Sequence, residues 1–148
     1  MKKEMQLAID TMESYSKAVH NNAITKGFWE SDNISEKMML VVTELSEAVE
    51  AMRKIKKDDI KDICKDNSII VNRLLNTITM VTFGDLDTIK VVNEEFANTI
   101  KDTVGDELAD AIIRVMDISE YLGVDIWKHL LMKIAYNSYR PYKHGKTF

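Results

Sequence analysis

The sequence predicts an all-α protein, and three observations support this prediction. Only one Pro and five Gly occur in 148 residues, whereas sandwiches and barrels need turn residues at most strand ends. Apolar side chains recur at spacings of three and four over long segments. Hydrophobic residues make up 45% of the chain and charged residues 30%, a balance typical of folded globular chains. The length fits one domain, residues 1–148.

A first helix is expected over residues 3–23, where apolar side chains recur every three or four positions. The following loop contains the adjacent aromatic residues Phe28 and Trp29. Two interpretations of these rings stay open: a plug on the core, or a wall on which a ligand stacks. Ser35 is an N-cap candidate for a second helix that runs to about Lys56.

The middle of the chain, residues 56–100, has a weaker apolar pattern that predicts short helices with a break at Gly84. A strongly periodic helix is expected within 105–123. It is expected to end there because Gly123 suits the position after a helix C-terminus. A last helix is expected over 126–139, before Pro141.

The formal net charge of −4 is unevenly distributed: the first 132 residues carry −8 and residues 133–148 carry +4. An acidic body argues against nonspecific nucleic-acid binding, which requires the neutralisation of many phosphates. A small phosphorylated ligand is compatible with the basic end. No apolar run approaches the roughly 18–20 residues of a membrane span. Because Cys64 is the single cysteine, no internal disulfide can form, and a cytoplasmic location is expected.

Two of the expected helices each place a pair of acids at the edge of an apolar face. Glu44 and Glu47 are three residues apart, so they project from neighbouring points of one helix. Glu107 and Asp110 repeat this spacing. Four converging carboxylates repel one another until a cation binds. Oxygen ligands favour Mg²⁺, with Mn²⁺ as the alternative.

Ion pairing is the competing explanation for these acids. Arg114 lies four residues after Asp110, and Lys37 or Lys54 is available to the first pair. Other chemistries are excluded by the sequence, which has no Glu-x-x-His motif of the di-iron type, no P-loop and no G-x-S-x-G elbow. Cys64 has no His near it in sequence, which argues against a catalytic thiol.

Three segments resemble the MazG-like all-α NTP pyrophosphatase superfamily. They are SEKMMLVVTELSEAVEAMRK (35–54), GDELADAIIRVMDISEYLGVDI (105–126) and KIAYNSYRPYKHGKTF (133–148). The stretch HNNAITKGFW (20–29) is similar to members from bacteria and their phages. Together these segments cover about half of the chain. The resemblance is carried by the E-x-x-E and E-x-x-D motifs joined to an Asn-x-x-Arg and a Lys-rich end.

The resemblance implies a MazG-like helical bundle in which residues 56–100 are an insertion, because 59 residues separate Glu47 from Glu107. It implies Mg²⁺-dependent hydrolysis of an NTP or dNTP to the monophosphate and pyrophosphate. It also implies a homodimer or homotetramer, without nucleic-acid or membrane partners. The metal positions carry over as Glu44, Glu47, Glu107 and Asp110.

Catalytic roles are assigned to Glu47, which would orient or deprotonate water, and to Arg140 and Lys143, which would offset phosphate charge. The expected substrate-binding residues are His20, Asn22, Phe28, Trp29, Asn137, Arg140, Lys143 and Lys146. The hypothesis from another class is a non-catalytic helical assembly or regulatory module, whose acids bind metal structurally or form salt bridges.

Overall fold

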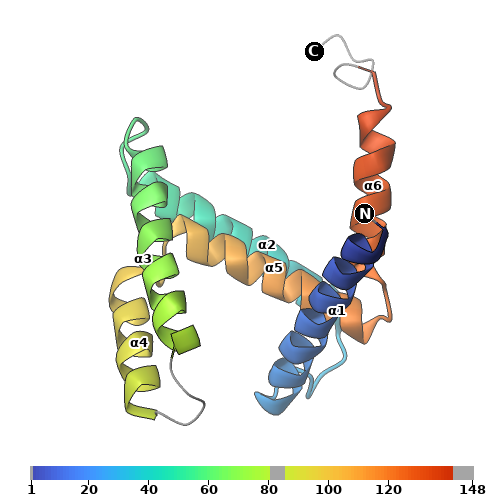
Figure 1. Cartoon of the computed structure of the whole chain (residues 1–148), viewed down its shortest axis with the longest axis horizontal. Helices are drawn as coiled ribbons and strands as arrows, with labels where there is room; N and C mark the ends of the chain where they lie inside the picture. Colours follow the sequence, from blue (N-terminus) through green and yellow to red (C-terminus); the bar gives the residue numbers. More distant parts are fainter. Residues whose placement is uncertain (1, 81–85, 142–148) are drawn as a thin grey trace. The chain divides into compact units, whose positions relative to one another are not determined.

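The computed structural model describes residues 2–80 and 86–141, which form six helices and no strand (Figure 1). This confirms the all-α prediction. No helix within those two ranges is long and apolar enough to cross a membrane. The helices are α1 (Lys2–Thr25), α2 (Ile34–Arg53), α3 (Ile60–Met80), α4 (Leu86–Thr99), α5 (Val104–Tyr121) and α6 (Ile126–Ser138).

The chain divides into two compact units. Unit 1 comprises Met1–Lys37 together with Ile113–Phe148, and unit 2 comprises Met38–Ile112. Helices α2 and α5 contribute residues to both units. The assignment of residues 1–148 to a single MazG-like domain stays a prediction.

The start of α2 differs from the predicted one. The helix begins at Ile34, and the side-chain Oδ1 of Asn33 accepts a hydrogen bond from the backbone N–H of Glu36 at 3.3 Å. Asn33 therefore caps the helix, and the prediction of Ser35 as N-cap was wrong by two positions. Asn is as good a cap as Ser, because its side-chain oxygen satisfies the same free N–H groups.

The end of α5 has the predicted glycine stop. Gly123 has φ +65°, a conformation that residues with a Cβ rarely adopt. The N–H of Val124 donates to the carbonyl of Ser119 at 2.8 Å, as in a Schellman motif. Asp125 then caps α6 by accepting a hydrogen bond from the N–H of Lys128 at 3.1 Å.

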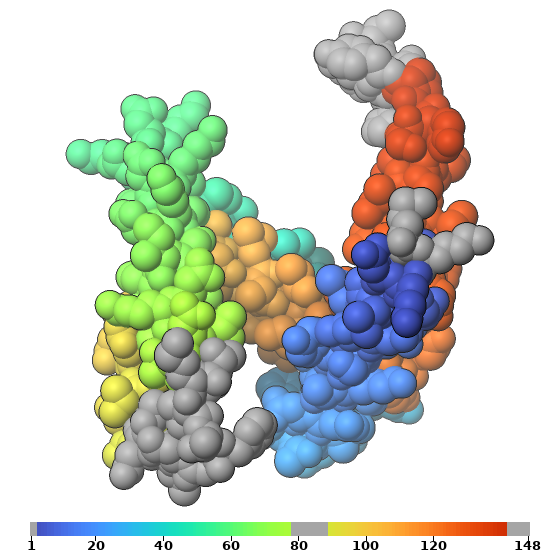
Figure 2. All heavy atoms as spheres, in the orientation of Figure 1, coloured from blue at the N-terminus to red at the C-terminus, as the bar shows by residue number. Residues whose placement is uncertain are grey.

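In unit 2, α3 and α4 pack side by side, as the green and yellow ribbons of Figure 1 and the green and yellow atoms of Figure 2 show. Leu74, Val92 and Ile100 form a buried cluster there, and Ile70 packs against it. The prediction of short helices in this segment was wrong, since α3 has 21 residues and α4 has 14. The predicted break at Gly84 lies outside the described residues.

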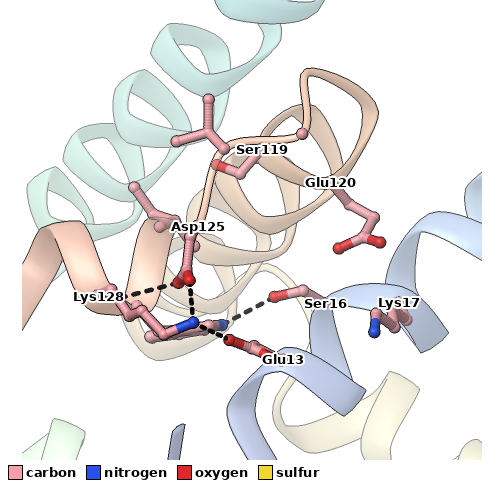
Figure 3. Close-up of a pocket in the computed structure, with 11 residues that line it drawn as sticks. Glu13, Ser16, Lys17, Ser119, Glu120, Asp125 and Lys128 are labelled. Atoms are coloured by element: carbon pink, nitrogen blue, oxygen red, sulfur yellow. Dashed lines mark hydrogen bonds and ion pairs between the residues drawn. The ribbon is translucent and has the colours of Figure 1, made fainter. Parts of the chain in front are cut away.

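In unit 1, α1 and α6 are in contact around a hollow of about 310 Å³ (Figure 3). The indole N–H of Trp127 donates to Ser16 Oγ at 2.9 Å. The ammonium of Lys128 contacts Glu13 Oε1 at 3.1 Å and also pairs with Asp125. These polar contacts fix the start of α6 against α1.

Candidate metal centre

Within unit 2, α2 and α5 bring together three of the four acids predicted as metal ligands. One carboxylate oxygen from each of Glu44, Glu107 and Asp110 lies within 4.8 Å of the other two. Octahedral Mg²⁺ at 2.0–2.1 Å holds its ligand oxygens about 3–4 Å apart, so small side-chain rotations suffice to bind it. The donor set, all carboxylate oxygen, suits a hard divalent cation.

Small residues allow these acids to approach each other. Ala48 and Ala111 are buried and follow Glu44 and Glu107 by four residues, one helical turn further on the same face. Glu44 is 7% exposed and Glu107 is 5% exposed. The two helices therefore bury a carboxylate each beside an alanine, where a larger side chain would hold them apart.

The environment of Glu107 is the most unusual in the cluster. Burial raises the pKa of its carboxyl, and repulsion from Glu47, Asp106, Asp110 and Glu44 raises it further. In the part of the chain that the structure describes, this carboxylate has no hydrogen bond and no ion pair. A buried acid surrounded by negative charge is a group that a bound cation would stabilise.

Asp102, Asp106 and Glu107 form a second group of acids within the same 4.8 Å limit. Two of these side chains already have partners, one a backbone N–H group and the other a lysine ammonium. Asp106 Oδ2 accepts a hydrogen bond from the N–H of Asp102 at 2.9 Å, and Asp102 pairs with Lys101 at 2.8 Å. The hydrogen bond to Asp102 raises the pKa of Lys101. Glu107 belongs to both groups of acids.

Glu47, the fourth predicted ligand, is exposed and lines a hollow of about 170 Å³ together with Glu107 and Lys54. Lys54 forms no ion pair with any residue that the structure describes. Glu50 lines the same hollow but pairs with Arg53, one turn further along α2. The hollow leaves Glu47 accessible to water beside the buried acids.

Two of the predicted substrate-binding residues, His20 and Trp29, meet at a residue that the sequence analysis missed. Asp117 is 5% exposed, and its Oδ1 lies 2.6 Å from Nδ1 of His20. The same oxygen accepts a hydrogen bond from the indole N–H of Trp29 at 2.9 Å. The sequence did contain an indication that Asp117 is buried, since this acid lies within the apolar stretch VMDIS (115–119).

The aromatic rings of the loop after α1 have partners inside unit 1. Trp29 stacks on Tyr121 with centroids 4.0 Å apart, and the Lys37 ammonium lies 5.6 Å from the Trp29 ring centroid. The Arg114 guanidinium lies 4.9 Å from the Phe28 ring centroid. These contacts favour the plug interpretation, and ligand stacking on either ring stays a prediction.

Asn22, Asn137 and Arg140 also belong to unit 1, whereas the four acids belong to unit 2. Asn22 is exposed on α1. Asn137 and Arg140 are exposed at the end of α6, where the N–H of Arg140 donates to the carbonyl of Asn137 at 3.1 Å. Lys143 and Lys146 lie outside the described residues.

No family model, no curated protein and no solved structure matches this chain. The resemblance to the MazG-like superfamily therefore stays a prediction from the motifs. The structure adds an all-α fold with a cluster of acidic residues.

The raised pKa of Glu107 predicts a pH-dependent stability. Between the ordinary carboxyl pKa of 4.5 and the higher native one, the folded state binds more protons, so stability falls as pH rises. Glu107→Gln is therefore expected to raise the melting temperature of the metal-free protein at neutral pH, and to change it little below pH ~4. Calorimetry in EDTA across this range measures both.

Adding millimolar Mg²⁺ should raise the melting temperature of the unmodified protein and have a smaller effect on Glu107→Gln. Glu50→Gln is the matched control, because Glu50 is exposed and paired with Arg53. Identical melting curves for Glu107→Gln and the unmodified protein at every pH would show that the charge of Glu107 does not destabilise the folded protein.

Proposed function

We propose that this chain is a Mg²⁺-dependent pyrophosphohydrolase that converts an NTP or dNTP into the monophosphate and pyrophosphate. The observation that supports it most is Glu107, a buried carboxylate whose pKa is raised by burial and by repulsion from four neighbouring carboxylates. A structural acid at this depth would need a hydrogen-bond donor or a cation from the protein. The resemblance of the acidic motifs and the basic C-terminal end indicates a polyphosphate substrate.

The cluster fits a divalent cation, which Glu44, Glu107 and Asp110 would hold with Glu47 beside them. When bound, the ion supplies the positive charge that a triphosphate requires. Glu47 is accessible in the adjacent hollow, so its carboxylate can orient a water molecule and accept its proton. The water oxygen bonds to the α-phosphorus as the bond between that phosphorus and the α–β bridging oxygen breaks. Pyrophosphate then leaves with the electron pair of the broken bond.

The decisive experiment is an assay of the purified chain with a panel of NTPs and dNTPs in Mg²⁺, in Mn²⁺ and in EDTA. Pyrophosphate and nucleoside monophosphate are expected in equal amounts, without inorganic phosphate, and neither is expected in EDTA. If no nucleotide is hydrolysed with either metal, the proposal is wrong, and a non-catalytic assembly or regulatory module becomes the better description.

Arg140 and Lys143 are proposed to offset substrate charge rather than to bind metal. Arg140→Ala and Lys143→Ala are therefore expected to raise KM for the triphosphate about tenfold, while binding of Mn²⁺ without nucleotide stays unchanged. Titration followed by electron paramagnetic resonance measures the metal binding. Lys133→Ala is the control, because Lys133 is a basic residue of the same end of the chain to which the resemblance assigns no substrate contact. A loss of metal binding in Arg140→Ala would contradict this division of roles.

A further inference from the structure

One lysine lines the hollow of about 170 Å³ beside the acidic cluster. The described residues around this hollow come from the end of α2 and from the start of α5, and all of them belong to unit 2 (Figure 1). They are Glu47, Glu50, Ala51, Lys54, Asp102 and Glu107. Lys54 is the only one of these six with a positive charge.

Two acids of the hollow have basic partners, and neither partner is Lys54. Glu50 pairs with Arg53. Asp102 pairs with Lys101 at 2.8 Å. Lys54 is exposed and forms no ion pair within residues 2–80 and 86–141. Its ammonium is therefore available for a ligand, although four carboxylates line the same hollow.

The end of α2 fixes the position of Lys54. Glu47, Ala51 and Lys54 are spaced by four and three residues, which places them on one side of the helix. The N–H of Lys54 donates to the carbonyl of Ala51 at 3.3 Å, so the last turn of the helix continues through Lys54. Glu47 and Lys54 are two turns apart, about 10 Å along the helix axis.

The charges of the proposed reaction require a cation at this place. A Mg²⁺ ion held by three carboxylates keeps a net negative charge, and the polyphosphate of a nucleotide is itself strongly anionic. A positive group of the protein beside the ion offsets this repulsion. Arg140 belongs to unit 1, and Lys143 lies outside the described residues. Among the described residues of unit 2, Lys54 is the cation that lines a hollow together with Glu107.

We propose that Lys54 contacts the polyphosphate chain of the substrate, an inference that rests on the proposed hydrolysis. Its ammonium donates hydrogen bonds to phosphate oxygens and offsets their charge. It binds no metal and transfers no proton. Because the polyphosphate is common to all nucleoside triphosphates, this contact is independent of the base.

Binding of inorganic pyrophosphate in Mg²⁺, measured by titration calorimetry, tests the contact without catalysis. Lys54→Ala should weaken this binding at least tenfold, because a charge-assisted hydrogen bond is lost. Lys54→Arg should restore most of the affinity. Titration with Mn²⁺ alone, followed by electron paramagnetic resonance, should show equal or tighter metal binding in Lys54→Ala, since a positive charge beside the carboxylates is removed.

These two measurements separate a phosphate contact from a structural role. A lysine just after a helix also offsets the helix dipole, and the loss of such a role would weaken pyrophosphate and Mn²⁺ binding together. That outcome would overturn the proposal. Lys57→Ala is the matched control, because Lys57 is exposed nearby but does not line the hollow. Both affinities should be unchanged in this variant.

Kinetics distinguish this proposal from the proposed hydrolysis. Lys54→Ala should raise KM by a similar factor for every nucleotide that the unmodified protein hydrolyses, and a rise confined to one base would contradict a phosphate contact. If the unmodified protein is active but Lys54→Ala binds pyrophosphate normally, only the role of Lys54 is refuted. If no nucleotide is hydrolysed while pyrophosphate binding depends on Lys54, the phosphate contact stands and the hydrolysis is refuted. Absence of pyrophosphate binding by the unmodified protein at millimolar concentration would refute the contact.

Discussion

Replacing Glu107 by Gln is expected to lower kcat/KM for nucleotide hydrolysis by at least about 100-fold. Gln keeps the shape of the side chain but removes the charge that would bind the cation. Glu44→Gln should have a similar effect, because Glu44 is buried in the same cluster. Steady-state rates of pyrophosphate release at saturating Mg²⁺ measure the loss.

Glu50→Gln is the control for this experiment, and its rate should stay within about twofold of the unmodified protein. Glu50 is exposed and pairs with Arg53. The ion-pair explanation makes a different prediction: Glu44→Gln would then shift the melting temperature equally with and without Mg²⁺. A Glu107→Gln variant that keeps most of its activity would refute the metal centre.

Asp117→Ala is expected to lower the free energy of unfolding by about 2–4 kcal/mol, because it leaves two half-buried donors without an acceptor. These donors are the Nδ1–H of His20 and the indole N–H of Trp29. Urea denaturation followed by circular dichroism measures the change. Asp117→Asn should be milder, since its amide oxygen can still accept one hydrogen bond.

Asp10→Ala is a suitable control for the Asp117 variants. Asp10 also accepts a side-chain hydrogen bond, from Gln6 at 2.7 Å, but on the exposed face of α1. Its loss should change stability by no more than about 0.5 kcal/mol. Equal changes in the free energy of unfolding at the two positions would mean that the burial of Asp117 adds nothing to stability.

Periodicity was sufficient to predict α1, α2, α5 and α6, since each has apolar residues at helical spacing and a recognisable end. It failed for the length of α3, whose first half is the polar sequence IKDICKDNS. That helix buries Leu74 against α4, a contact that depends on packing between helices rather than on local sequence. The N-cap of α2 was misplaced because Asn33 and Ser35 are both good cap residues.

The acidic cluster was largely predictable, because the projection of α2 and α5 placed Glu44 and Glu107 on apolar faces and burial confirms both. The role of Asp117 was not. An acid within an apolar stretch indicates burial but does not identify its partner. His20 is 97 positions away in the chain, so only the folded unit brings them together.

The division into two units has a spectroscopic consequence. Both tryptophans, Trp29 and Trp127, and all five tyrosines lie outside 38–112. Fluorescence excited at 280–295 nm therefore reports on unit 1 alone, whereas amide ellipticity reports on all six helices. Unfolding curves from the two signals coincide if the units melt together and separate if they do not. A Trp introduced in 38–112 would make the acidic cluster visible to fluorescence.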